Sequence, residues 1–342
     1  MSLLSHLGIG LPVLAAPMAG GAGTPALVTA AARAGGLGFL AAGYRGPQEL
    51  AEQIDTVRAE GLPFGVNVFA PNPVPITPAA HRAYADALEP EAARFGLSLA
   101  GAEPIEDDDH WTDKVDLLLA SPVPLVSFTF GLPGPGILAA LRDAGSVVAQ
   151  TVTSADEARQ AVAAGVDMLI VQAAAAGGHS ATFTPERPPP PTPLPELVAE
   201  IARVVTLPLI AAGGVATAAD ARAALRAGSE AVMVGTVLLR TEESGAAEAH
   251  RTALTDPAFD TTVVTRAFTG RPARGLRNLF TDRYEPIAPL GYPAVHHLTA
   301  PLRKAAAAVG ENRLMHLWAG TGHREARAEP AGQTLTRLYD GL

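Results

Sequence analysis

The feature that most limits the fold of this chain is a series of eight short apolar runs, separated by segments with helical periodicity. Each run is apolar at nearly every position, which is typical of a strand buried on both faces of a parallel sheet. The runs lie at 11–16, 37–42, 64–69, 125–130, 146–151, 167–171, 207–212 and 231–236. Eight buried strands alternating with helices predict an α/β fold, a (β/α)8 TIM barrel.

The segments between these runs carry helix signals. Thr24 and Thr217 stand where N-caps are expected, and the sequence that starts at Ser154 has the pattern of a capping box. A doubly wound open sheet is the main competing architecture. No Gly-x-Gly-x-x-Gly motif opens a strand–helix unit in this chain, so the barrel is favoured.

The remaining patterns predict three domains: a barrel at 1–240, a smaller C-terminal lid or substrate-covering extension at 241–312, and a segment at 313–342 that returns to the barrel. We expect a helix from Thr241 and a last helix near 333–339. Two proline-rich stretches break the pattern. The first, within 71–114, predicts loops and short helices, and the second, at 187–195, predicts an extended surface loop.

Composition excludes several classes of function. The chain of 342 residues has a net charge of −9 and no Lys/Arg-rich block, which argues against nucleic-acid or anionic-membrane partners. It has no cysteine, so disulfides, thiolate metal sites and cysteine nucleophiles are excluded. Residues 1–10 do not resemble a signal peptide, and no apolar run approaches transmembrane length. We therefore expect a cytoplasmic protein.

The ends of the last two strands predict an anion site. Gly213 and Gly214 follow the seventh run, and Gly235 and Thr236 close the eighth. Glycines can present backbone N–H groups without interference from a Cβ atom, and the loops after strands seven and eight of a barrel often bind phosphate. The alternative is a purely structural role, in which the glycines only terminate the strands. Their presence at two consecutive strand ends favours phosphate.

Neutral amides at other strand ends narrow the choice of ligand. Asn67, Gln150 and Gln172 lie near the ends of the third, fifth and sixth runs. Amides can both donate to and accept from the polar edge of an isoalloxazine ring, whereas a sugar phosphate alone would not require them. No His/carboxylate cluster has the spacing of metal ligands, so we predict no metal site.

A histidine follows the sixth strand. Gln172 closes the strand, Gly177 and Gly178 allow a turn or a close approach to a ligand, and His179 comes next. Loops at the carboxyl ends of parallel strands are where ligands bind and chemistry takes place. His179 is therefore either an acid/base or substrate-orienting group, or a solvent-exposed residue after a turn, and this stretch alone leaves both readings open.

Seven motifs together resemble the nitronate monooxygenase family, formerly called 2-nitropropane dioxygenases. They cover nearly the whole chain: Ala15-Ala16-Pro17-Met18-Ala19, Gly65-Val66-Asn67, Gln172 to His179, Ala211-Ala212-Gly213-Gly214-Val215, Val234-Gly235-Thr236, Thr265 to Gly275 and Leu317-Trp318-Ala319-Gly320. Two positions depart from the family pattern. Ala175 stands where an acidic residue is usual, and Ala181 stands where glycine is frequent. These departures bear on substrate detail more than on flavin binding.

The resemblance implies an FMN-bound barrel with His179 as catalytic base and Met18 beside the flavin ring. The residues expected to bind the cofactor are Pro17, Met18, Asn67, Gln150, Gln172, Gly177, Gly178, Gly213, Gly214, Met233, Val234, Gly235 and Thr236. The implied reaction is oxidation of alkyl nitronates, or of nitroalkanes, by O2 to a carbonyl compound and nitrite. Its partners are then a small-molecule substrate and O2.

Two alternatives stay open. One is an FMN-dependent enoyl reductase that uses NADH or NADPH, and the other is a flavin- or phosphate-binding barrel without turnover. The sequence specifies neither the substrate pocket nor the oligomeric state.

Overall fold

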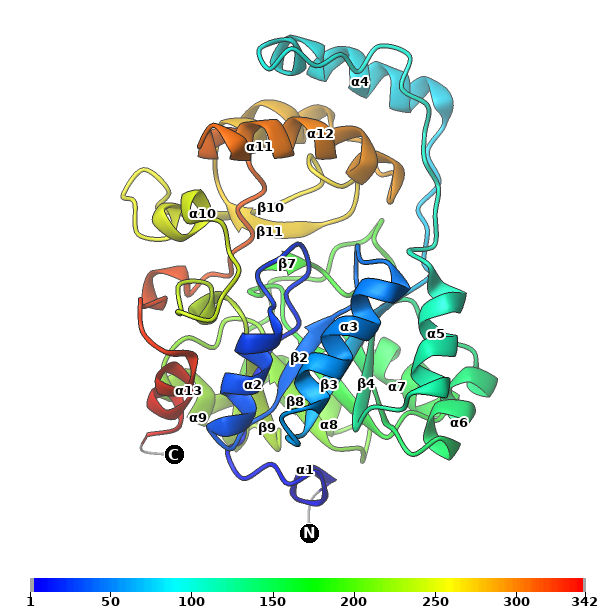
Figure 1. The fold of residues 1–342 in the computed structure, drawn as a ribbon, viewed down its shortest axis with the longest axis vertical. Coiled ribbons are helices and arrows are strands. Elements are labelled where there is room, and N and C mark those ends of the chain that lie inside the picture. Colours follow the sequence, from blue (N-terminus) through cyan, green and yellow to red (C-terminus); the bar gives the residue numbers. More distant parts are fainter. Residues whose placement is uncertain (1–2, 341–342) are drawn as a thin grey trace.

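A computed structural model describes residues 3–340. The first two residues of the N-terminal stretch and the last two of the predicted C-terminal segment lie outside the described residues. Eight parallel strands close into a barrel, which confirms the predicted (β/α)8 architecture (Figure 1). In barrel order the strands are β1 (Val13–Ala15), β2 (Gly38–Ala41), β3 (Phe64–Ala70), β4 (Leu125–Phe130), β5 (Val147–Val152), β6 (Met168–Gln172), β8 (Leu209–Ala212) and β9 (Ala231–Val234).

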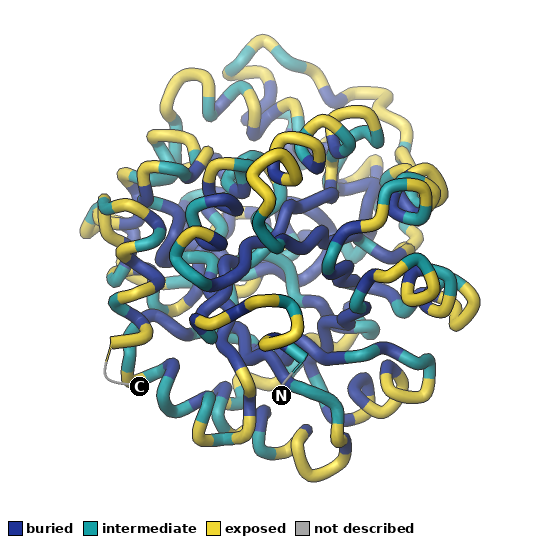
Figure 2. The backbone as a smooth tube through the Cα atoms, turned by 60° about the horizontal axis from the view of Figure 1, so that its bottom comes forward, coloured by how far each residue is buried: buried dark blue, intermediate teal, exposed yellow. Residues whose placement is uncertain are grey.

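Helices surround the barrel. They are α2 (Pro25–Arg33), α3 (Pro47–Arg58), α5 (Trp111–Ala120), α6 (Pro135–Asp143), α7 (Ala155–Ala164), α8 (Leu194–Ala202), α9 (Ala218–Arg226) and α13 (Ala331–Tyr339). The last strand, β9, is followed only by a short 3-10 turn, η1 (Thr236–Leu238). Helix α13, from the end of the chain, packs against α2, α9 and β1 and thereby completes the ring. Figure 2 shows buried backbone at the centre and exposed turns around it.

The strands separate two apolar clusters. Side chains such as Leu14, Phe39 and Ile170 fill the barrel interior, whereas Val66 and Val171 pack outward against the helices. The short helix α1 (Leu3–His6) contributes Leu4 to the interior cluster, at the end of the barrel away from β7, β10 and β11 (Figure 1). Successive strand residues therefore face opposite ways although both faces are apolar.

A cap covers the other end of the barrel. It contains a three-stranded sheet in the order β10 (Thr262–Thr265), β11 (Ala273–Leu276) and β7 (Gly178–His179). Its helices are α4 (Pro78–Ala93), α10 (Glu248–Ala253), α11 (Leu279–Tyr284) and α12 (Ala294–Ala308). Tyr84 and Leu88 of α4 join Phe268, Phe280 and Leu302 in one apolar cluster. The cap is thus built partly from the connection between β3 and β4, within the range predicted as barrel.

Two local predictions differ from the structure. The helix expected from Thr241 is a turn, in which the Thr241 hydroxyl donates to Leu238 O, and α10 begins only at Glu248. The stretch expected to hold loops and short helices contains the 16-residue α4, because Pro78 occupies its first turn and Pro90 its last. Strand β11, within the extension predicted at 241–312, has a short arginine- and glycine-containing sequence that gives no strand signal. Within residues 3–340, none of the helices is long and apolar enough to cross a membrane.

Candidate active site

A cavity of about 380 Å³ lies where the carboxyl ends of the barrel strands meet the cap. All the predicted site residues except Gln150 line it, together with residues that the sequence analysis did not single out. Those additional lining residues include Tyr44, Phe69, Thr129, Phe130, Thr151, His250, Met315, His316, Trp318, Gly320 and Gly322. A cavity of this size and place is the usual position of an active site in this architecture.

The prediction for Gln150 is wrong, and the alternation of strand side chains explains why. Ala149 packs inside the barrel and Val148 outside it, so Gln150 faces outward and Thr151 faces the cavity. The Gln150 side chain is fully buried and its Nε2 donates to backbone carbonyls, including that of Gly131. Counting alternate positions from the inward-facing residues of β5 would have selected Thr151 instead.

Asn67 and Gln172 both reach the cavity, but much of their hydrogen-bonding capacity is used by the protein. Asn67 Nδ2 donates to Ser127 Oγ at 2.9 Å and Thr129 Oγ1 at 3.0 Å. Gln172 bridges its own loop, because its Nε2 donates to His179 O at 3.2 Å and its Oε1 accepts from Ala181 N at 2.8 Å. Gln172 therefore holds the backbone on both sides of Ser180. Ala181, one of the two departures from the family pattern, is a fully buried part of this bridge.

The two glycine loops form one wall of the cavity. Gly213 and Gly214 have φ values of +98° and +86°, which side chains other than glycine rarely adopt. A Cβ atom on Gly213 would lie 2.7 Å from Ala173 O, so the sequence needs glycine there. Helix α9 begins just beyond, and its N-terminus is capped by Thr217 and Asp220. These loops can accept an anion close to a helix N-terminus.

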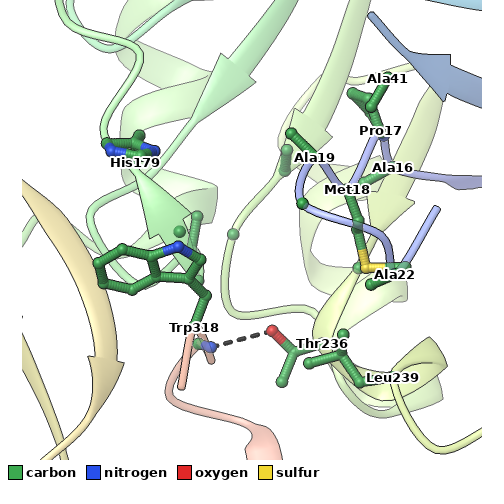
Figure 3. A pocket seen from close by; sticks show the side chains of 18 of the residues that line it. Ala16, Pro17, Met18, Ala19, Ala22, Ala41, His179, Thr236, Leu239 and Trp318 are labelled. Atoms are coloured by element: carbon green, nitrogen blue, oxygen red, sulfur yellow. Dashed lines mark hydrogen bonds between the residues drawn. The ribbon is translucent and has the colours of Figure 1, made fainter. Parts of the chain in front are cut away.

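The C-terminal segment completes this wall. Gly320 N donates to Thr236 Oγ1 at 2.9 Å, and Thr321 N donates to Ala175 O at 3.1 Å. A Cβ atom on Gly177 would lie 2.5 Å from Gly320 N, so the two loops approach each other closely. Figure 3 shows Met18, Thr236 and Leu239 on one side of the cavity and His179 and Trp318 on the other.

His179 lies in β7, which pairs with β11 of the cap through Ala273. Its ring packs edge-on against Phe130 and Tyr292, with centroid distances of 5.6 and 5.9 Å, and lies 5.5 Å from the Trp318 ring. Its Nε2 is 2.9 Å from Thr269 Oγ1. The histidine is therefore a wall residue of the cavity held by the cap, and the solvent-exposed alternative does not fit this packing.

Burial, together with the positive charges of Arg271 and Arg303, lowers the pKa of His179 to about 3. Arg271 is fully buried, and its guanidinium stacks 4.1 Å from the Phe130 ring centre. It donates to backbone carbonyls of Asn72 and Thr182 rather than to a carboxylate. The imidazole is therefore neutral at neutral pH, beside cationic groups that favour an arriving anion.

Three more histidines have lowered pKa values: His250 and His316 contact Trp318, and His296 stacks on Tyr44. Burial lowers the pKa of His250 to about 4 and that of His296 to about 2. The pKa of His316 is also depressed, and its Nδ1 is buried without a hydrogen-bond partner among the described residues. Residues 3–340 contain no group of three or more His, Asp or Glu side chains arranged to hold a metal ion.

These buried histidines predict a loss of stability in mild acid. Below about pH 6.5 the unfolded chain takes up protons at these imidazoles, whereas folded His179 stays neutral until about pH 3. Each such histidine then lowers the free energy of unfolding by about 1.4 kcal/mol per pH unit. Urea unfolding at about pH 7 and about pH 5 measures this slope. His250→Gln should make this slope shallower by the contribution of one histidine, because one proton fewer is taken up on unfolding. Equal stability of the protein at both pH values would contradict the assignment.

The fold and the cavity define a (β/α)8-barrel enzyme with a capped active site, a candidate anion cradle and a neutral histidine. The comparisons with known proteins agree. The family profile described as nitronate monooxygenase matches residues 2–341. The chain belongs to the nitronate monooxygenase family, whose members are in general flavin-dependent oxidoreductases.

Individual relatives cover nearly the whole chain. A probable nitronate monooxygenase of Staphylococcus aureus is 36% identical, over 99% of this chain and 96% of its own. The crystal structure of a nitroalkane oxidase from Streptomyces ansochromogenes is 45% identical, with a TM-score of 0.92, and covers 98% of this chain and 96% of that one. The structure of FabK from Thermotoga maritima is 26% identical, with a TM-score of 0.76, and covers 99% and 94%.

Proposed function

We propose that this protein uses FMN and O2 to oxidise alkyl nitronates to a carbonyl compound and nitrite, and that it also takes neutral nitroalkanes. The observation that carries the proposal is the placing of His179 in the same cavity as the glycine loops, with two buried guanidinium groups acting on it. Membership of the nitronate monooxygenase family and the likeness to a nitroalkane oxidase support it.

The cavity fits FMN. A phosphate would lie against Gly213, Gly214 and Gly235, where the missing Cβ atoms expose backbone N–H groups. Gly213 and Gly214 also have positive φ angles. Thr236 Oγ1 accepts from Gly320 N, which leaves the Thr236 hydroxyl proton available to a phosphate oxygen. Pro17 and Met18 would lie beside the ring, with Asn67 and Gln172 near its polar edge. The remaining contacts proposed are Gly177, Gly178, Met233 and Val234. Gln150 is withdrawn because it faces away.

Bound FMN would supply the oxidation chemistry, and the chain's own residues supply binding and proton transfer. For a neutral nitroalkane, His179 removes the proton from the carbon next to the nitro group. Arg271 and Arg303 oppose the resulting imidazolium, but the nitronate formed beside it is an anion and offsets them. A substrate that arrives as a nitronate needs no proton removal. The same positive charges then favour its binding, and His179 orients it.

Anaerobic mixing of the purified protein with propionate 3-nitronate, followed in the visible flavin bands, tests this function. We expect the bands to bleach and to recover when air is admitted. The second candidate is an FMN-dependent enoyl reductase that uses NADH or NADPH. A yellow protein that ignores the nitronate but bleaches with NADH or NADPH would favour that candidate. A colourless protein that does not take up added FMN would contradict flavin binding and leave a phosphate-binding barrel.

A further inference from the structure

Thr269 makes a second contact besides the one to His179. Its hydroxyl oxygen is 2.9 Å from His179 Nε2 and 3.2 Å from the backbone carbonyl oxygen of Arg271. Thr269 is 1% exposed and Arg271 is fully buried, so water does not compete for these groups. No other hydrogen bond to the Arg271 carbonyl is formed by the residues described.

A hydroxyl group has one proton, and this fixes the direction of both bonds. The Arg271 carbonyl can only accept, so the Thr269 hydroxyl must donate to it or leave it unpaired. Once that proton is committed, the oxygen faces His179 with a lone pair, and Nε2 must carry the hydrogen. The opposite arrangement would satisfy the imidazole but leave a buried carbonyl without a donor, so it is the less stable of the two.

The other ring nitrogen is then unprotonated. His179 Nδ1 makes no hydrogen bond with any residue in the described range, and the side chain lines the cavity. We propose that Thr269 is a positioning residue that holds His179 as the Nε2–H tautomer and so presents Nδ1 to the cavity as the proton acceptor. The role of Nδ1 in turnover rests on the proposed function, whereas the tautomer itself does not.

One short segment holds both the backbone and the ring of His179. Ala273 pairs with His179 in the cap sheet, and Thr269 holds the ring four residues earlier in the chain. Between them, Arg271 is anchored by its bonds to Asn72 O and Thr182 O. The cap therefore fixes the orientation of the ring as well as its place. When Nδ1 takes up a proton, Nε2–H keeps its bond to Thr269, so no proton has to move elsewhere in this chain of hydrogen bonds.

Ring ¹⁵N–¹H correlation spectra of the holoenzyme near pH 7 test the tautomer directly. The His179 signals are assigned as those that disappear in His179→Asn. We expect the shifts of a neutral ring with hydrogen on Nε2 and a bare Nδ1. A ring with hydrogen on Nδ1, or a freely exchanging mixture, would overturn the proposal. This readout does not depend on turnover, so a protein that oxidises no nitronate would refute the function and leave the tautomer measurable.

Two substitutions at Thr269 separate positioning from packing. Thr269→Val keeps the shape but removes the hydroxyl, and Thr269→Ser keeps the hydroxyl but removes a methyl group. We expect Thr269→Val to lower kcat/KM for nitroethane about 10- to 100-fold and that for the ethyl nitronate less than about 3-fold, because the nitronate needs no base. Thr269→Ser should retain both activities. Equal losses with the two substrates in Thr269→Val, or failure of Thr269→Ser to restore nitroethane oxidation, would instead indicate a packing role.

Discussion

Replacing His179 with Asn is expected to lower kcat/KM for a neutral nitroalkane about 100- to 10,000-fold, which is the usual contribution of a general base. An amide has no basic nitrogen, whereas the neutral imidazole of His179 has one facing the cavity. The loss should be much smaller with a nitronate, which arrives deprotonated. The protein should stay yellow, because the predicted phosphate contacts lie on the glycine loops across the cavity. Steady-state kinetics with both substrates and the flavin spectrum measure these effects.

His110→Asn is a matched control for this substitution. His110 lies at the start of α5 with φ +55°, a conformation that Asn tolerates, and its side chain is 59% exposed. It does not line the cavity, so the control should keep full activity. If His179→Asn lost its flavin, His179 would be a structural residue. If it oxidised nitroalkanes at the normal rate, another group would have to be the base.

Placing a carboxylate on the candidate phosphate loop should strongly weaken flavin binding. Gly235 has room for a side chain, because a Cβ atom there would lie 3.5 Å from Ala16 Cβ and from Met18 Sδ, which is ordinary contact. Its φ of −123° is also open to other residues. In Gly235→Asp, a unit charge about 4 Å from a phosphate charge costs about 4 kcal/mol at an effective dielectric constant of about 20. We expect FMN affinity to fall about a thousandfold.

Gly235→Asn separates charge from bulk. The two substituted side chains have nearly the same size, so steric effects on the cofactor are matched and only the charge differs. Titration of the flavin-free protein with FMN, followed by fluorescence, gives both dissociation constants, and thermal unfolding checks that the fold is retained. Equal affinities for Gly235→Asp and Gly235→Asn would place the phosphate away from this loop. A normal affinity in both would remove Gly235 from the binding site.

Much of the barrel was predictable because its signals are local. The apolar runs at 64–69 and 125–130 became β3 and β4 almost residue for residue. The N-caps at Thr24, Ser154 and Thr217 each accept a backbone N–H as expected. Strand ends in a parallel barrel converge, so polar residues and glycines at those ends were expected to meet around one cavity. All of the predicted site residues except Gln150 do so.

The prediction for Gln150 failed for a different reason. When both faces of a strand are apolar, the sequence shows that the strand is buried but not which residues face inward. Only the packing of Ala149 inside and Val148 outside sets that phase in β5. For the same reason the sequence analysis did not identify Thr151 and Thr129, which line the cavity together with Asn67 and Gln172.

The surroundings of His179 could not be predicted because they come from distant parts of the chain. Thr269 lies 90 residues from His179 in sequence, and Arg271 lies 199 residues from Asn72. The short strands of the cap, such as Ala273–Leu276, have no periodic pattern in the sequence. They are stabilised by contacts with distant segments, such as the pairing of β11 with β7, and such contacts leave no local signal.

The sequence by itself determined the number of strands, the barrel, the glycine loops and the histidine that faces them. Apolar periodicity, helix caps and the residue types at strand ends all depend on residues that are neighbours in the sequence. The tertiary structure alone decided the chemical state of that histidine. Packing against Phe130, Tyr292 and Trp318 shields the ring from much of the water. Two guanidinium groups distant in sequence disfavour its charge, and Thr269 holds its Nε2. Desolvation and long-range charge depend on what is brought close in space, and no local pattern records that.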